Sequence, residues 1–92
     1  MRIMVSKFGE ILTSRPAGRD AALAARAYLL PDKAGEIVLD FEGVKVLTPS
    51  WADEFIAGIE AAQLGRVSFD HTSNPSVTAT LDILAQQPTV AA

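Results

Sequence analysis

The chain has 92 residues, of which 49% are hydrophobic and 21% are charged, so its composition is that of one small folded domain and not of a disordered segment. Its formal net charge of −3 argues against nucleic-acid binding, and its lack of cysteine excludes a disulfide framework and a thiolate metal site. We expect a single domain over residues 1–92, with residues 86–92 as a frayed tail.

The first elements are predicted to be two short strands. Residues 3–5 form an apolar run that is typical of a strand, and Gly9 marks a turn after it. Residues 10–13 are then expected to return beside the first strand, so that the two strands form a hairpin.

A first helix is predicted to begin after Ser14 and to end near Leu30. Ser14 is placed to act as the N-cap, and Pro16 lies in the first turn, where its missing N–H is harmless. Alanine and leucine dominate the segment that follows, and both favour helices. Because Leu23, Ala27 and Leu30 recur at helical spacing, we expect them to face the core.

Residues 36–41 are the clearest strand in the sequence. They form a nearly continuous apolar run, which indicates burial on both faces. Such a pattern is typical of a central strand in a parallel sheet, and Gly43 ends it.

A second helix is predicted from Ser50 to about residue 64. Ser50 stands where an N-cap would, and Asp53 three residues later resembles the partner in a capping box. Trp51, Phe55 and Ile59 recur every four residues, which favours a core-facing stripe. Trp51 is alternatively an exposed anchor for a partner.

The last elements are a strand over residues 66–71 and a third helix that opens at Asn74 and carries an apolar side formed by Val77, Leu81 and Leu84. Strands and helices therefore alternate along the chain. This order predicts an α/β fold with a mainly parallel sheet of three or four strands and about three helices.

Residues 39–55 are the most informative stretch for function. Asp40 and Glu42 lie at the end of the best strand, and the hydroxyls of Thr48 and Ser50 lie where the next helix begins. Ligands of open α/β sheets bind near the carboxyl ends of strands, and helix N-termini favour anions. This region is therefore the candidate site.

Ser50 has two interpretations, a plain helix cap and a phosphorylation site. A phosphate there would stand close to Asp53 and Glu54, and the repulsion could switch a partner surface off. Asp53 and Glu54 do not suit an acid/base pair, because adjacent helical residues point about 100° apart. We expect them to be solvated carboxylates.

No catalytic or metal constellation is evident in the sequence. Asp40 and Glu42 share strand spacing, as a weak Mg²⁺ site would require, but no third ligand is evident. His71 is the only histidine and has no placed nucleophile or metal partner. We therefore expect no enzyme activity, no metal and no cofactor. The start of the chain lacks the apolar stretch of a signal peptide, so we expect a cytoplasmic protein.

Several blocks of the sequence resemble a bacterial STAS-like family of unknown function. They are FG at residues 8–9, LTSR at 12–15 followed by Ala17, IVLDFEGV at 37–44 and TPSWADEF at 48–55, and the resemblance extends over about residues 3–72. It implies the fold of the anti-sigma factor antagonists. In that superfamily a serine or threonine at a helix start can be phosphorylated by a partner kinase, and the dephosphorylated antagonist binds that kinase and frees a sigma factor.

By this resemblance the position of the phosphorylated serine is Ser50, with Asp40 on the preceding strand. The chain has LTPS at residues 47–50, where the antagonists usually have Asp-Ser-Ser-Gly. Arg15 is by resemblance a recurring feature of the family, and an ion pair with Asp53 or Glu54 is expected.

The leading hypothesis is a STAS-like signalling module that binds a protein, such as a histidine-kinase-like ATPase or a transcriptional regulator. Its expected partner-binding residues are Thr48, Ser50, Trp51, Asp53 and Glu54. The alternative is a sensor that binds a nucleotide or another small anion at the N-terminus of the same helix. Neither hypothesis involves nucleic acid or a membrane, and a homodimer is compatible with both.

Overall fold

Strand β3 (Glu36–Asp40) is the centre of the molecule, as its apolar run predicts. In the computed structural model, which describes residues 2–28, 36–62 and 66–86, β3 lies between β1 (Arg2–Met4) and β5 (Arg66–Asp70), and both neighbours run parallel to it. Ile37 and Leu39 are fully buried. The predicted α/β class, with its parallel sheet and three helices, is confirmed.

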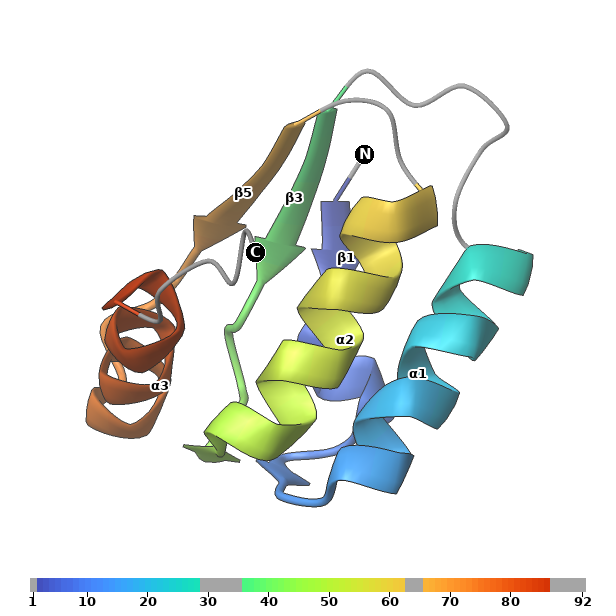
Figure 1. Cartoon of the computed structure of the whole chain (residues 1–92). Coiled ribbons are helices and arrows are strands. Elements are labelled where there is room, and N and C mark those ends of the chain that lie inside the picture. The colour runs from blue at the N-terminus through green and yellow to red at the C-terminus, as the bar shows by residue number, and fades with distance from the viewer. Residues whose placement is uncertain (1, 29–35, 63–65, 87–92) are drawn as a thin grey trace.

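Helices α1 (Arg15–Tyr28) and α2 (Pro49–Ala62) lie side by side on one face of this sheet (Figure 1). The two helices pack so closely that a Cβ atom at position 18 would clash with the backbone of Trp51. The oxygen of the Ser14 side chain accepts the N–H of Ala17 at 3.2 Å, so the predicted cap of α1 is confirmed.

The predicted core stripe of α1 is wrong. Leu23 is 54% exposed and Ala27 is also exposed, whereas the buried face consists of Gly18, Ala21, Ala22 and Ala25. The reason is the short distance between the two helices: only small side chains fit there, so the bulkier leucine turns to the solvent. The predicted end at Leu30 lies outside the described residues.

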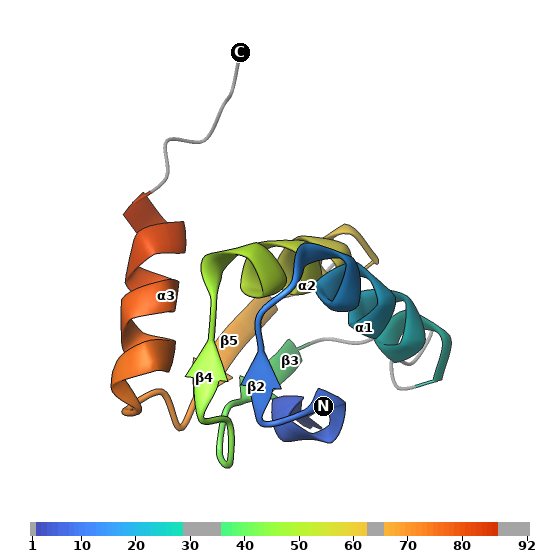
Figure 2. The same cartoon turned by 90° about the horizontal axis from the view of Figure 1, so that it is seen from below.

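The predicted hairpin is also wrong. A 3₁₀ helix, η1 (Val5–Phe8), follows β1 and takes Val5, expected as a strand residue, into the core. β2 (Ile11–Leu12) does exist, but it pairs in parallel with β4 (Val46–Leu47), a strand for which the sequence carries no clear signal. The two form a short second sheet, which Figure 2 shows with α3 beside β4.

Helix α3 (Pro75–Gln86) follows β5 and packs against α2 and β4. Asn74 caps it, since its side-chain oxygen accepts the N–H groups of Ser76 at 2.8 Å and Val77 at 3.3 Å. Val77 is buried, and Leu81 and Leu84 pack against the core, as predicted. No helix among the described residues is both long enough and apolar enough to span a bilayer. Gln86, which was expected to belong to the frayed tail, is instead the last residue of α3. Residues 87–92 of that tail and the predicted end of the second helix near residue 64 lie outside the described part.

Candidate functional site

Helix α2 begins at Pro49, and only Thr48 separates it from β4, so the prediction that Ser50 is its N-cap is wrong. The first helical hydrogen bond runs from the N–H of Ala52 to the carbonyl of Thr48 at 3.0 Å. Proline favours the first position of a helix, because its φ angle is already helical and it needs no N–H partner there. Ser50 and Asp53 consequently form no capping box, and Asp53 lies in the second turn.

Thr48 connects the start of α2 to the segment before α1. Its backbone N–H donates to the carbonyl of Leu12 at 3.0 Å, and its hydroxyl donates to the carbonyl of Thr13 at 2.9 Å. The hydroxyl therefore has a structural task. Thr48 is nevertheless partly exposed, so it remains at the edge of the expected partner surface.

Trp51 is a core residue and not an exposed anchor. Its exposed fraction is 1%, and its ring stacks on Phe55 with centroids 4.8 Å apart and lies 6.4 Å from the ring of Phe8. The interpretation of Trp51 as a core residue is confirmed, and the alternative of an exposed anchor is wrong. The four-residue spacing of aromatic residues was the correct signal.

Arg15 joins the two helices on the solvent side. Its Nη1 atom lies 3.1 Å from Oδ2 of Asp53 and 3.2 Å from Oε1 of Glu54, so the expected ion pair is present with both carboxylates. The hydrogen bond that Arg15 donates to Asp53, followed by the one that it donates to Glu54, raises the pKa of Arg15, which keeps its charge. All three side chains are at least one-quarter exposed. We name Arg15, Asp53 and Glu54 the helix cluster.

Ser50 lies one turn before this cluster. Asp53 and Glu54 follow it by three and four residues, so the three side chains share one side of α2. Ser50 is half-buried, and within the described residues its hydroxyl makes no hydrogen bond. A hydroxyl without a hydrogen-bond partner among the described residues therefore lies next to a set of exposed, paired charges.

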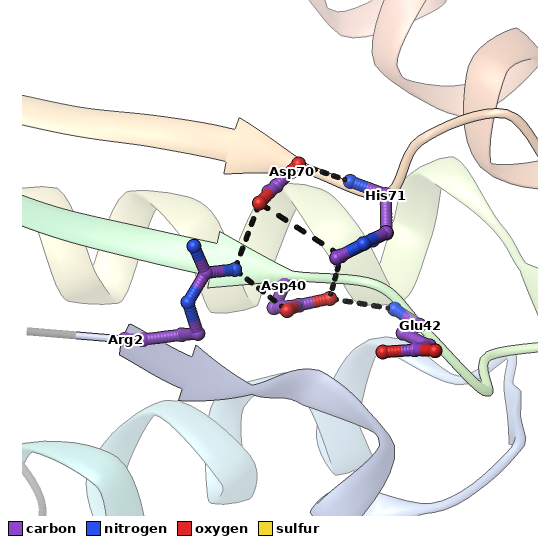
Figure 3. A network of polar contacts seen from close by, with 5 residues as sticks. All are labelled: Arg2, Asp40, Glu42, Asp70 and His71. Atoms are coloured by element: carbon purple, nitrogen blue, oxygen red, sulfur yellow. Dashed lines mark hydrogen bonds and ion pairs between the residues drawn. The ribbon is translucent and has the colours of Figure 1, made fainter.

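A second polar cluster lies at the carboxyl ends of β3 and β5. Figure 3 shows Arg2 bridging Asp40 and Asp70, with distances of 2.6 Å and 2.8 Å from its Nη1 atom. His71 places Nδ1 2.8 Å from Oδ1 of Asp40 and donates its backbone N–H to Asp70 at 2.8 Å. We name Arg2, Asp40, Asp70 and His71 the sheet cluster.

The sheet cluster lies on the sheet face opposite α1 and α2 (Figure 3). Side chains alternate along a strand, so Asp40 points away from the helices that cover Ile37 and Leu39. The parallel register places Asp40 directly beside Asp70, and His71 follows in a left-handed conformation with φ of 52°. These contacts join the ends of three strands.

Burial raises the pKa of Asp40, but the hydrogen bonds that it accepts from the Glu42 N–H, Arg2 and His71 lower the pKa by more. The pKa therefore lies below its ordinary value, and the carboxylate remains ionised. The pKa of Asp70 is lowered, mainly by Arg2. The pKa of His71 is raised from its ordinary value of 6.5, chiefly by its hydrogen bond to Asp40. The cluster thus pairs its charges internally.

Sequence reasoning missed the role of His71. The donor atoms of Asp40, Glu42 and His71 lie within 4.8 Å of one another, so the third ligand that the sequence did not reveal is present in space. Both oxygens of Asp40 are already bonded, however, and Arg2 places a positive charge beside them. A metal ion would have to displace these partners, and we assign the group to structure.

The model of a family described as a STAS-like domain of unknown function (DUF4325) matches residues 26–75. This range includes β3, β4, α2 and β5 and, apart from the two arginines, the residues of both polar clusters. This match covers more than half of the chain. The chain belongs to this STAS-like family. No curated protein and no solved structure matches the chain.

The family match includes Asp40, Ser50 and His71, whereas Arg2 and Arg15 precede it. Both arginines that organise the polar clusters therefore come from the N-terminal part of the chain. A STAS-like domain suggests a regulatory module that acts by binding another protein.

Proposed function

We propose that this STAS-like domain binds a protein partner through the N-terminal ends of α1 and α2, and that phosphorylation of Ser50 releases the partner. The observation that carries the proposal is the position of Ser50, whose hydroxyl is free of hydrogen bonds within the described residues and lies one helical turn from the helix cluster. A partner of this kind is a histidine-kinase-like ATPase or a transcriptional regulator.

A phosphate on Ser50 would change the charges of this surface. It adds a charge of about −1.5 to −2 near the positive end of the α2 dipole, so α2 itself tolerates it. Asp53 and Glu54, on the same side of the helix, would be repelled, and the phosphate would compete with them for Arg15. The exposed charges would then rearrange.

Such a rearrangement costs the fold little. Arg15 and Asp53 are each about half exposed, and exposed ion pairs contribute little to stability because water screens them. The same surface can therefore have two charge patterns on one folded domain. The two carboxylates also make this helix start a poor site for a free anion, which is why we favour protein binding over the alternative of a small-ligand sensor.

The test combines a modification assay with a binding assay. We expect the protein purified from its own cells to carry a phosphate that is absent from a Ser50→Ala variant, as measured by intact mass. We expect Ser50→Glu to weaken binding of the co-purified partner by about tenfold or more, measured with both proteins purified.

Ser73→Glu is the matched control, because Ser73 is exposed and lies in the connection between β5 and α3. It should leave binding unchanged. Equal binding by wild type and Ser50→Glu would contradict the switch, provided that the melting temperature of the variant shows it is folded.

A further inference from the structure

A groove of about 390 Å³ lies between η1, β2 and α1, directly beside the start of α2. Its floor is apolar and includes Phe8, Leu12 and the buried Trp51. Ile11 stands at its rim and is 66% exposed, the largest exposed fraction among the large hydrophobic side chains of the described residues. The volume is sufficient for a few side chains of a binding partner.

The groove exists because α1 presents only short side chains to it. Ala17, Ala21 and Ala24 line one wall at helical spacing, and a methyl group reaches only a short way from the helix. Trp51 closes the bottom but does not fill the space above it. The alanine-rich composition of α1 thus produces both its close contact with α2 and this opening on its other side.

The groove runs along an open edge of the small sheet. β2 has β4 as its neighbour strand, and the N–H groups of Val46 and Thr48 donate to the carbonyls of Glu10 and Leu12. In a parallel ladder, every second residue of a strand directs its N–H and C=O toward a given neighbouring strand. Glu10 and Leu12 direct theirs toward β4, so the N–H and C=O of Ile11 point away from it. An added strand could bond to them.

The opposite edge of the same sheet is closed. The N–H of Leu47 donates to the Ser76 hydroxyl at 3.0 Å, and its carbonyl accepts the Thr80 hydroxyl at 2.6 Å. Helix α3 therefore satisfies the outer side of β4 with its own side chains. Within the described residues no element does the same for β2.

The charge of the groove indicates what would bind there. Asp20 is the charged side chain among the lining residues, and it forms no ion pair within the described residues. Its neighbours on α1, Arg15 and Arg19, face the carboxylates of α2 instead. A lysine or arginine of a partner would complement Asp20 without competing with an existing pair.

We infer that this groove receives an extended segment of the protein partner, which adds to the edge of β2, places apolar side chains against Phe8 and Trp51, and sets a basic side chain beside Asp20. This inference rests on the proposed function and names its docking mode. Strand addition provides affinity through the backbone and specificity through alternate side chains.

The test is selection of short random peptides displayed on phage against the full chain, followed by affinity measurements with the selected peptides made synthetically. We expect selected sequences to alternate apolar residues and to contain a lysine or arginine. Asp20→Lys, which reverses the charge, and Ala24→Trp, which fills the groove from an exposed position, should each weaken peptide binding by about tenfold or more.

Asp82→Lys on α3 and Ala57→Trp on α2 make the same changes at other exposed positions and should leave binding unchanged. Absence of selected peptides, or equal losses in the matched variants, would overturn the inference. Sedimentation provides a further check: self-association of the wild type that Ala24→Trp abolishes would mean that a second copy occupies the groove and would also overturn it.

The same peptides distinguish this inference from the phosphorylation proposal. If Ser50→Glu binds the partner as well as wild type does while Asp20→Lys loses the peptide, the groove stands and the switch fails. If Ser50→Glu loses the partner while none of the groove variants affects the peptide or the partner, the switch stands and the groove fails.

Discussion

Arg2 and Arg15 each bridge two carboxylates from other elements, with comparable distances, but in different surroundings. In the sheet cluster, Asp40 has a side chain that is only 4% exposed. In the helix cluster, Asp53 is 46% exposed and Glu54 is 25% exposed. Similar ion pairs therefore contribute differently to the stability of the fold, because a buried pair is screened by water less than an exposed pair.

Asp40 cannot exchange its partners without cost. Its two oxygens accept the N–H of Glu42 and contact Arg2 and His71, so that it joins the ends of the strands. The helix cluster can exchange partners, since water replaces a lost contact. The sheet cluster therefore maintains the sheet, whereas the helix cluster can rearrange as the proposed switch requires.

The largest expected effect is that of Asp40→Ala. The substitution leaves the N–H of Glu42 without its acceptor and removes the contact by which Arg2 on β1 holds β3. We expect the free energy of unfolding to fall by about 2–3 kcal/mol, measured by urea denaturation. A loss below about 0.5 kcal/mol would mean that the sheet cluster does not stabilise the fold as its burial indicates.

A smaller effect is expected from pH. The pKa of His71 is raised in the folded state by Asp40 and, more weakly, by the charges of Asp70 and Glu42. Arg2 is the positive charge nearby, and it contacts the other oxygen of Asp40. The stabilisation by His71 is therefore complete below its ordinary pKa of 6.5 and is lost as pH rises through the higher folded value. The urea midpoint should therefore fall as pH rises above about 6.5.

His71→Asn tests the origin of this pH dependence. Asparagine tolerates the left-handed conformation at this position but does not titrate, so the variant should keep its backbone and lose most of the fall in urea midpoint. An unchanged fall in His71→Asn would assign the pH dependence to another group.

The smallest expected effect on stability is that of Asp53→Asn. The exposed helix cluster contributes little, so the urea midpoint should stay within experimental error of wild type. Binding of the partner should nevertheless change, because Arg15 loses one of its two carboxylates. A clear loss of stability would remove the contrast between the two clusters.

Local patterns predicted the elements whose signals lie within a few residues. The apolar run of β3, the Ser14 cap of α1 and the opening of α3 at Asn74 all depend on neighbouring residues in the chain, and the structure confirms each. The pairing of β2 with β4 could not be predicted in the same way, since strands of two residues carry almost no periodicity.

The start of α2 shows how a local rule can point to the wrong residue. Ser50 and Pro49 are both favoured near a helix start, and the sequence alone does not rank them. Thr48 decides the outcome through its bonds to Leu12 and Thr13, which hold the turn before Pro49 in place. Those contacts are distant in sequence and could not enter a local prediction.

The sequence by itself determined the alternation of strands and helices, the central place of β3 and the STAS-like resemblance, because these follow from hydrophobic periodicity and from short motifs. Only the tertiary structure decided which side chains meet. The parallel register brings Asp40 to Asp70 and His71, the close packing of α1 on α2 brings Arg15 to Asp53, and the short alanine side chains of α1 leave the groove open. Contacts of this kind depend on the paths of segments far apart in the chain, and no local pattern of residues records them.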